Sequence, residues 1–264
     1  MITWFIGSLL ATSLLLAFVL LVRGPVLRAF GPKVAYALWA LPALRLILPP
    51  LPAWFKPVQT AVGTTVSPLE VVTAGSRALD IVTGSSAAPD TTVLLAVWAL
   101  GATAWFAIQM LRYHGFLGRA LTGATLLGRD CGVSVFVSPA VTGPMATGIV
   151  VRRILLPTDF ADRYTSSERR LALLHEGAHH DRGDIHANFL ALGMVAVLWW
   201  NPIAHYAYRC FRADQELACD ATVLAGSGVE DRQTYGSALL KSASARTSTV
   251  ACALSHKDEL RRRL

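Results

Sequence analysis

The amino-acid sequence predicts a mainly α-helical membrane protein, with about three transmembrane helices followed by an α+β domain that contains a small pair of β-strands. Of its 264 residues, 53% are hydrophobic and only 16% are charged, whereas soluble domains average about 25% charged residues. Three long apolar segments, near residues 2–22, 34–51 and 91–111, account for this shortage of charge. Downstream of them, short β-branched runs and helical periodicity indicate a mixed domain over residues 113–264.

The first and third apolar segments are uncharged and long enough to cross a bilayer. A helix of about 20 residues spans the hydrocarbon core, and both 2–22 and 91–111 reach that length. No Lys or Arg precedes the first segment and Arg23 follows it, which favours a retained spanning helix over a cleaved signal peptide. The third segment lies between Asp90 and Arg112.

The second apolar segment is the weakest of the three. It covers residues 34–51 and contains Pro42 and Arg45. The arginine is close enough to the end of the segment to snorkel towards the lipid headgroups, or else it faces other helices. With this span, residues 1–112 form a transmembrane region that includes an extracytoplasmic loop over 52–90.

Positive charges in the short loops predict the orientation. The loop after the first span and the region after the third are rich in basic residues: Arg23, Arg28, Lys33, Arg112, Arg119 and Arg129. The 52–90 segment instead mixes two basic residues with three acids. We therefore expect the N-terminus and the 52–90 loop outside the cell and the C-terminal domain in the cytoplasm.

The net charge of +7 follows largely from this bias, with a contribution from anionic lipid headgroups. The sequence has no stripe of Lys and Arg interleaved with aromatic residues, so direct binding of nucleic acid is not expected. Four cysteines lie in the cytoplasmic half and form no C-x-x-C pair, which is typical of reduced, structural thiols: Cys131, Cys210, Cys219 and Cys252.

The C-terminal domain begins with a glycine-containing connector over residues 113–130. Two runs rich in β-branched residues, 133–137 and 149–157, follow it and predict a small strand pair. An edge strand of this kind either holds an extended peptide by strand addition or merely caps the helical core.

Three helical segments complete the predicted domain. The first begins at one of the residues 165–167, each of which is a good N-cap, with Glu168 in its first turn. The second is a very apolar helix near 186–206, which we expect to be membrane-associated because an Asn-Pro break at Asn201 weakens a spanning interpretation. The third runs over 204–226 and ends at a glycine.

The sequence HEGAH in the first of these helices carries the main functional signal. His175 and His179 stand four residues apart and so share one helix face. Glu176 is rotated by about 100° from His175, which places it beside a shared metal ion rather than on it. This is the H-E-x-x-H arrangement of zinc ligand, general base and zinc ligand. His180 is one residue out of register. A chance cluster on a polar helix is the alternative.

A catalytic zinc needs a third protein ligand and an open fourth position. The sequence RADQELACD offers Glu216 as that ligand. Asp220 lies one turn further on and can accept a hydrogen bond from the free N–H of a ligand histidine. Arg212 is on the same side and is expected to support these acids by pairing with them. An ordinary ladder of charged residues on a helix surface is the alternative.

Taken together, HEGAHHDRGD, WWNP, ELACD and the tyrosine of QTYGSALL resemble the membrane metallopeptidases of the beta-lactam-sensor type. These are the penicillinase antirepressor and methicillin-resistance sensor-transducers and their relatives. The upstream LWALPALRLILP and RRILLP are also similar to that family, so the resemblance covers most of the chain. Family sensors usually continue into a fourth span and an extracytoplasmic ligand-binding domain, whereas this sequence stops at DELRRRL, so that part is either absent or was lost or removed, and the sequence does not itself support antibiotic sensing.

The resemblance implies a zincin-like, gluzincin-type endopeptidase on the cytoplasmic side of a bacterial inner membrane, with one Zn²⁺ per chain. By position, His175, His179 and Glu216 would be the ligands and Glu176 the general base. Asp184 matches the family's aspartate after the motif and would have a structural role at a helix end. Family members take part in regulatory proteolysis, so the implied substrate is a cytoplasmic transcriptional repressor or the protein itself.

Two other functions remain open from the sequence. One is a non-catalytic signalling scaffold with a structural or vestigial zinc site, although such a site has no need of the glutamate base. The other is a housekeeping membrane protease similar to the prenyl-protein and heat-shock zinc proteases. The donor that stabilises the oxyanion is also left open among Tyr206, Tyr208, Tyr235, His205 and His256.

Overall fold

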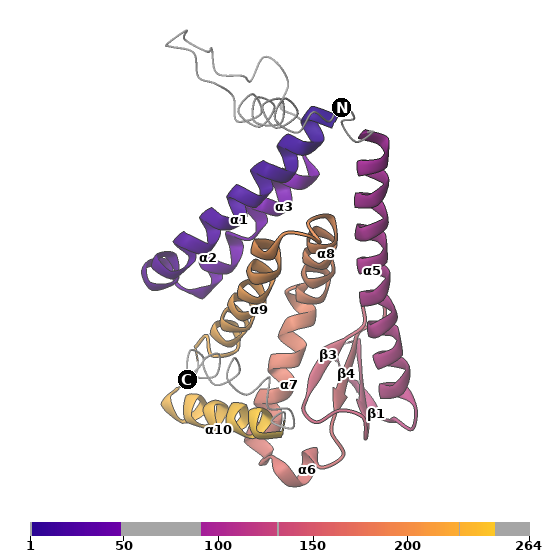
Figure 1. The fold of residues 1–264 in the computed structure, drawn as a ribbon. Coiled ribbons are helices and arrows are strands. Elements are labelled where there is room, and N and C mark those ends of the chain that lie inside the picture. Colours follow the sequence, from indigo (N-terminus) through magenta and orange to yellow (C-terminus); the bar gives the residue numbers. More distant parts are fainter. Residues whose placement is uncertain (1, 49–90, 131, 227, 246–264) are drawn as a thin grey trace.

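The computed structural model describes residues 2–48, 91–130, 132–226 and 228–245. Helices dominate, and a small mixed sheet lies at the foot of the long helix α5 (Thr91–Leu121) (Figure 1). Helices α8 (Asp184–Val197) and α9 (Pro202–Val223) lie between α5 on one side and the hairpin of α1 (Ile2–Phe30), α2 (Pro32–Ala37) and α3 (Ala40–Ile47) on the other (Figure 1). Helix α7 (Ser166–Asp181) leads from them to the base of the molecule (Figure 1). This arrangement confirms the mainly helical class and the presence of a mixed helix-and-sheet portion.

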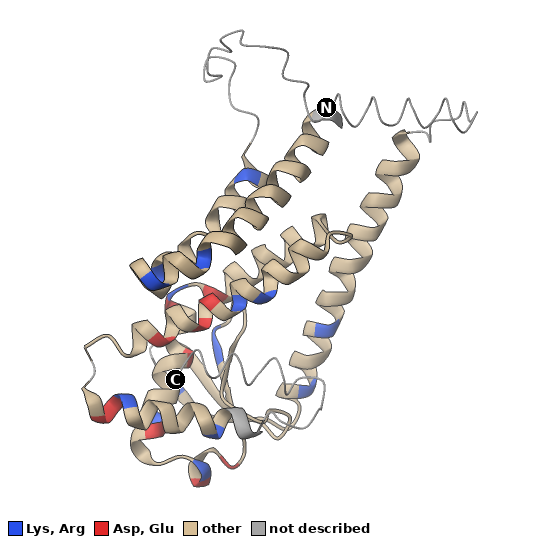
Figure 2. Ribbon diagram, turned by 60° about the vertical axis from the view of Figure 1, so that its left-hand side comes forward, with Lys and Arg blue, Asp and Glu red and all other residues tan. Residues whose placement is uncertain are grey.

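Two of the described helices are long and apolar enough to cross a membrane. They are α1 (Ile2–Phe30), over Trp4–Phe30, and α5 (Thr91–Leu121), over its whole length. Both continue beyond the predicted spans 2–22 and 91–111 because their basic residues do not interrupt the helical hydrogen bonds. Figure 2 shows that the upper parts of α1 and α5 carry no charge and that most charged residues lie in the lower half of the molecule.

The predicted second span, 34–51, is not one continuous helix in the described part of the chain. It contains α2 (Pro32–Ala37) and α3 (Ala40–Ile47), separated by a turn. Pro42 has no N–H to donate to the carbonyl of Leu38 four residues earlier. The Leu41 N–H donates to that carbonyl instead, at 3.1 Å, and the helix tightens and breaks. The rest of this segment and the 52–90 loop lie outside the described residues.

The sheet is larger than the predicted strand pair, since it has four strands in the order β1-β2-β4-β3. Strand β1 pairs antiparallel with β2, β2 parallel with β4, and β3 antiparallel with β4. The predicted connector over 113–130 is wrong: α5 continues to Leu121, and a strand follows it. The strands are β1 (Thr125–Asp130), β2 (Val133–Val137), β3 (Met145–Thr147) and β4 (Arg153–Leu156).

Strand β3 lies at one edge of the sheet and is held there by a tight connection to β4. Gly148 has φ +93° at this connection, and a Cβ atom on it would lie 1.9 Å from the carbonyl oxygen of Val151. Only glycine fits such a backbone. The turn therefore fixes β3 against β4 and leaves the opposite edge of β3 facing helix α7.

The short helix α6 (Phe160–Arg163) is followed by α7 (Ser166–Asp181), which begins at a capping box. The Thr165 hydroxyl accepts from the Glu168 N–H at 3.3 Å, and the Glu168 carboxylate accepts from the Thr165 N–H at 2.8 Å. The predicted N-terminus at 165–167 is thus confirmed.

The predicted membrane-associated helix near 186–206 is two elements. Helix α8 (Asp184–Val197) ends before a turn, and α9 (Pro202–Val223) starts after it, two residues earlier than predicted. Asn201 causes the restart, because its side chain caps α9 by accepting from the Ile203 N–H at 2.9 Å. Helix α10 (Val229–Ala245) then packs against α7.

Candidate metal centre

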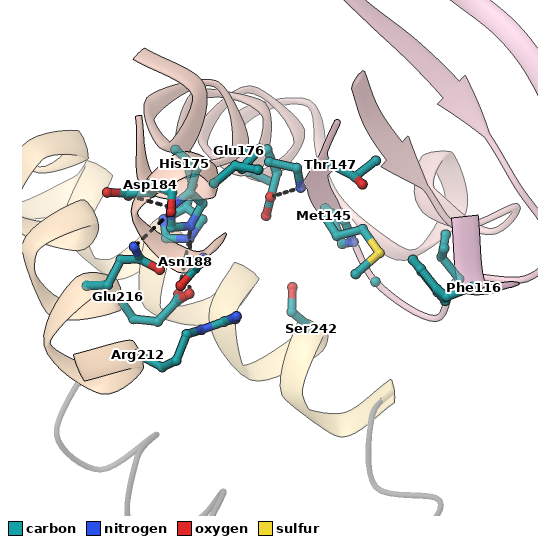
Figure 3. Close-up of a pocket in the computed structure, with 18 of the residues that line it drawn as sticks. Phe116, Met145, Thr147, His175, Glu176, Asp184, Asn188, Arg212, Glu216 and Ser242 are labelled. Carbon is teal, nitrogen blue, oxygen red and sulfur yellow. Dashed lines mark hydrogen bonds and ion pairs between the residues drawn. The ribbon is translucent and has the colours of Figure 1, made fainter. Parts of the chain in front are cut away.

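Helix α7 presents His175 and His179 on one buried face, with their Nε2 atoms 3.1 Å apart. Helix α9 brings Glu216 opposite them: its carboxylate oxygens lie 3.5 Å from Nε2 of His175 and 3.7 Å from Nε2 of His179. Two imidazoles on one tetrahedral zinc ion, with bonds of 2.0–2.1 Å, would place their nitrogens about 3.3 Å apart. The three side chains therefore fit a metal ion between them. Figure 3 shows the Glu216 carboxylate facing His175.

His179 is oriented from behind by Asp184. The Asp184 Oδ2 lies 2.7 Å from Nδ1 of His179 and also accepts from Nε of Arg182 at 3.1 Å. Asp184 is the first residue of α8 and is only 1% exposed. Its contact with Nδ1 leaves Nε2 of His179 facing His175 and Glu216. Asp184 thus orients His179 in addition to the predicted structural role at a helix end.

His175 is oriented from behind by a tyrosine that the sequence did not single out for this purpose. The Tyr235 hydroxyl lies 2.7 Å from Nδ1 of His175 and donates to Oδ1 of Asp220 at 2.6 Å. Asp220 itself is 3.4 Å from Nδ1. The predicted histidine–aspartate contact is therefore relayed through Tyr235, which lines the cavity over the centre but whose hydroxyl is engaged by His175 and Asp220.

The surroundings of the two histidines favour positive charge. Burial alone would lower the pKa of His175, but hydrogen bonds to Cys219 and Glu216 and the charge of Glu176 raise that pKa to about 10. Burial likewise opposes the hydrogen bonds with Asp184 and Cys219 and the charge of Glu216, which together raise the pKa of His179 to about 11. An environment that stabilises the extra protons of two imidazolium ions also stabilises a divalent cation that replaces those protons and is bound by the neutral rings.

Cys219 is a further donor that the sequence analysis treated as a structural thiol. Its Sγ and the ligand nitrogens of His175 and His179 lie within 4.8 Å of one another. Burial would raise the pKa of the Cys219 thiol, but hydrogen bonds from the two histidines lower it. The signal available in the sequence was its spacing, three residues after Glu216 on the same helix.

Glu176 points towards the sheet. Its Oε2 accepts a hydrogen bond from the Ala146 N–H of β3 at 2.6 Å, and the residue is 9% exposed. His180 turns away from the centre, where its Nε2 lies 3.0 Å from the Arg153 carbonyl oxygen. Glu176 thus points in a different direction from His175 and His179, as its position on the helix predicts.

A cavity of about 540 Å³ opens over the centre between α5, β3, α8, α9 and α10. His175, Glu176 and Glu216 line it, and so does Arg212, whose exposed side chain lies one turn before Glu216 (Figure 3). The Oδ1 atom of Asn188 is buried in this wall and has no hydrogen-bond partner among the residues that the structure describes.

The other residues considered for oxyanion stabilisation lie in different places. Tyr208 lines the cavity. Tyr206 is 59% exposed on the surface, and Nε2 of His205 lies 2.8 Å from the Trp199 carbonyl oxygen. His256 lies outside the described residues. Proximity to the cavity therefore favours Tyr208 within this set.

Two histidines of an H-E-x-x-H helix that face a carboxylate on a second helix are characteristic of the metallopeptidase class. The comparison with protein families agrees with this class. The model of the BlaR1 peptidase M56 family matches residues 4–264. The chain belongs to that family.

Curated relatives include the regulatory protein BlaR1 of Bacillus licheniformis, 30% identical over 118 residues, which is 44% of this chain and 20% of that protein. The methicillin resistance mecR1 proteins of Staphylococcus aureus and Staphylococcus epidermidis are 28% identical over 109 residues, or 41% of this chain and 19% of each relative. The matched segment thus spans about a fifth of the length of each relative. The resemblance to the beta-lactam-sensor type is confirmed.

Proposed function

We propose that the protein is a membrane-embedded zinc metalloendopeptidase of the gluzincin type that cleaves a cytoplasmic or membrane-proximal protein in regulatory proteolysis. The observation that carries the proposal is the pair of Nε2 atoms of His175 and His179, which face the Glu216 carboxylate beside Glu176. Membership of a peptidase family supports it. One Zn²⁺ per chain would be held by these two histidines and Glu216.

The bound ion would supply a Lewis acid and an activated water at neutral pH. Side chains and backbone groups of the protein would transfer the proton and orient the ligands. Glu176 is placed to accept a proton from the attacking water, and the Ala146 N–H fixes its carboxylate at the cavity wall. Asp184 and the Tyr235–Asp220 pair contact Nδ1 of the two imidazoles, so that each Nε2 atom would face the metal ion. Arg212 would support the site by adding positive charge beside Glu216.

The cavity suggests how a peptide would lie. Strand β3 forms one wall, through Met145, Ala146 and Thr147, and its outer edge has no strand partner among the described residues. The Ala146 N–H on this edge is bonded to Glu176, so an extended substrate would add through the other backbone groups of the edge. Asn188, on the opposite side, offers its buried Oδ1 to a backbone N–H of that substrate. Of the two interpretations of the edge strand, these contacts favour peptide binding.

We further propose that residues 1–112 form the transmembrane region and residues 113–264 the cytoplasmic peptidase domain. Only 6% of the apolar window of α5 is buried by the rest of the protein, so lipid is the natural cover for it. The α2–α3 segment would complete a third crossing, with the N-terminus and the 52–90 loop outside. The positive-inside bias supports an active site on the cytoplasmic side of the membrane, and the bacterial relatives support the inner membrane of a bacterium.

The substrate class follows from the same position. A centre at the foot of membrane helices would reach cytoplasmic proteins and chain segments near the bilayer. A transcriptional repressor, or a segment of the protein itself, fits this requirement. The names of the relatives, a regulatory protein and methicillin resistance proteins, support a regulatory role.

The test uses the full chain in lipid nanodiscs, as wild type and as Glu176→Gln, with bound zinc and peptide cleavage measured on the same samples. Both proteins should bind about one zinc, and only the wild type should cleave itself or casein, with a loss of at least 100-fold in the variant. Zinc binding without cleavage by the wild type would favour the non-catalytic scaffold. Absence of zinc from both would overturn the ligand assignment.

A further inference from the structure

The carboxylate of Asp184, which orients His179, contacts three side chains, two at the end of α7 and one on α2. Oδ2 contacts Nδ1 of His179 at 2.7 Å and Nε of Arg182 at 3.1 Å. Oδ1 accepts from the hydroxyl of Tyr36 at 3.2 Å, and Tyr36 lies 148 positions earlier in the sequence, on α2. The hairpin formed by α1, α2 and α3 thus contributes directly to the surroundings of a metal ligand.

The Tyr36 hydroxyl is itself fixed by helix α9. Nε2 of Gln215 donates to the Tyr36 hydroxyl at 2.9 Å and to the backbone carbonyl of Asp184 at 3.2 Å. Gln215 is 1% exposed and directly precedes the ligand Glu216 in sequence. The guanidinium of Arg182 lies over the Tyr36 ring, 5.3 Å from its centroid. Tyr36 is therefore locked between the helices that carry the donors of the centre.

A second contact fixes the hairpin to α9 beside the same ligand. Asp214 is fully buried, two residues before Glu216, and pairs with Arg23 of α1 through both carboxylate oxygens, with Nε at 2.9 Å. Nε1 of Trp39 donates to the same carboxylate at 2.8 Å. A charge buried in this way is costly unless it is paired, so the hairpin is held in one position relative to α9. Tyr36 consequently approaches Asp184 in a defined geometry.

We propose that Tyr36 is a positioning residue of the metal centre: its hydroxyl fixes the Asp184 carboxylate and, through it, the imidazole of His179, so that the placement of the α1–α3 hairpin sets metal affinity. The inference rests on the proposed function only in requiring that His175, His179 and Glu216 bind zinc. Without the hydroxyl, the Asp184 carboxylate is free to rotate about its remaining partners, and Nε2 of His179 is held less firmly in line.

The magnitude follows from the distance of Tyr36 from the ion. Residues that bond directly to a ligand histidine change metal affinity by about 10- to 100-fold when they are mutated. Tyr36 acts one contact further out, so Tyr36→Phe is expected to weaken zinc binding by about fivefold, below that range. In a protein that already carries Asp184→Asn, Tyr36→Phe should not weaken zinc binding further.

The experiment is a double-mutant cycle on the full chain in nanodiscs, with Tyr36→Phe, Asp184→Asn and the double variant. Zinc affinity is measured by competition with a chelator, and the visible absorption of the Co²⁺-loaded protein reports the ligand geometry. Tyr164→Phe is the matched control, because Tyr164 is a buried tyrosine whose hydroxyl bonds to Ser242 at 2.8 Å. Metal-free thermal midpoints show whether each variant folds.

We expect weaker zinc binding and an altered Co²⁺ spectrum for Tyr36→Phe, no change in either for Tyr164→Phe, and no further loss when Tyr36→Phe is added to Asp184→Asn. Unchanged zinc affinity in a folded Tyr36→Phe protein, or losses that simply add in the double variant, would overturn the inference while leaving the proposed function standing. A wild type that binds no zinc would overturn both.

Discussion

At the scale of single residues, the centre depends on what lies behind each histidine. The Nδ1 atom of His179 faces a carboxylate, and that of His175 faces a tyrosine hydroxyl that is backed by a carboxylate. Each arrangement selects the tautomer whose Nε2 is free to bind a metal ion. The two imidazoles are thus oriented independently, although they belong to one helix.

The relay behind His175 leads to a prediction for Tyr235. The substitution Tyr235→Phe removes the hydroxyl that joins His175 to Asp220 and leaves the ring in place, so zinc affinity should fall by about tenfold. Chelator competition measures the change. Asp220→Asn, which keeps an acceptor for the Tyr235 hydroxyl, should cost less. Equal affinity of Tyr235→Phe and wild type would show that the relay does not orient His175.

Part of this site could be predicted from sequence because it depends on spacing within one helix. The H-E-x-x-H spacing predicts the shared face of His175 and His179, and the spacing of Glu216 and Asp220 predicts their shared face. Cys219 has a spacing signal of the same kind, but Tyr235 and Tyr36 could not be assigned in this way, since their contacts depend on how α10 packs against α7 and α2 against α9. No periodicity in the sequence encodes those crossings.

At the scale of elements, the start of α7 fixes the helix that carries the motif. The capping box joins Thr165 to Glu168, and Nζ of Lys241 on α10 donates to the same Glu168 carboxylate at 2.6 Å. Burial alone would raise the pKa of Glu168, but Lys241 and the Thr165 N–H outweigh it and lower that pKa. The charged carboxylate therefore stabilises the fold.

Glu168→Gln should lower the free energy of unfolding by about 1 kcal/mol at pH 7. Because the folded-state pKa lies below the unfolded value of 4.5, the stabilisation is complete above that pH and is lost as the pH falls through the folded-state pKa. The difference in thermal midpoint between the two proteins should thus shrink below pH 4.5. Glu230→Gln, at an exposed position of α10, is the control and should change little. A difference that persists unchanged at low pH would contradict the assignment to charge.

The elements themselves show where sequence reasoning succeeds and fails. Long apolar runs predict α1 and α5 because length and composition suffice for them. The break between α2 and α3 depends on Pro42, and the presence of a proline in the sequence does not by itself show which carbonyl loses its partner. The sequence of β1 predicts a connector, because a strand containing Gly128, Arg129 and Asp130 is stabilised by pairing with β2 rather than by its own composition.

At the scale of the whole molecule, α5 packs against α8 and the turn after it through one close approach. Nε1 of Trp98 donates to the Val197 carbonyl oxygen at 3.0 Å. A Cβ atom on Gly101 would lie 2.5 Å from the Trp199 ring. Gly101 therefore allows the long helix to close one side of the cavity above the metal centre.

Gly101→Leu should force α5 away from Trp199 and cost about 1–3 kcal/mol, seen as a lower midpoint of thermal unfolding in detergent. Gly7→Leu is the matched control, because a Cβ atom on Gly7 of α1 would meet nothing within 4 Å. Equal midpoints for the two variants would mean that the close approach of α5 does not contribute to stability.

The central claim, that His175, His179 and Glu216 hold one zinc ion with a position left open, is tested most directly by zinc X-ray absorption on the metal-loaded full chain. We expect a first shell of nitrogen and oxygen at about 2.0–2.1 Å and no sulfur. A sulfur shell at about 2.3 Å would contradict it, because Cys219 would then be a ligand and the centre would resemble a closed, structural site.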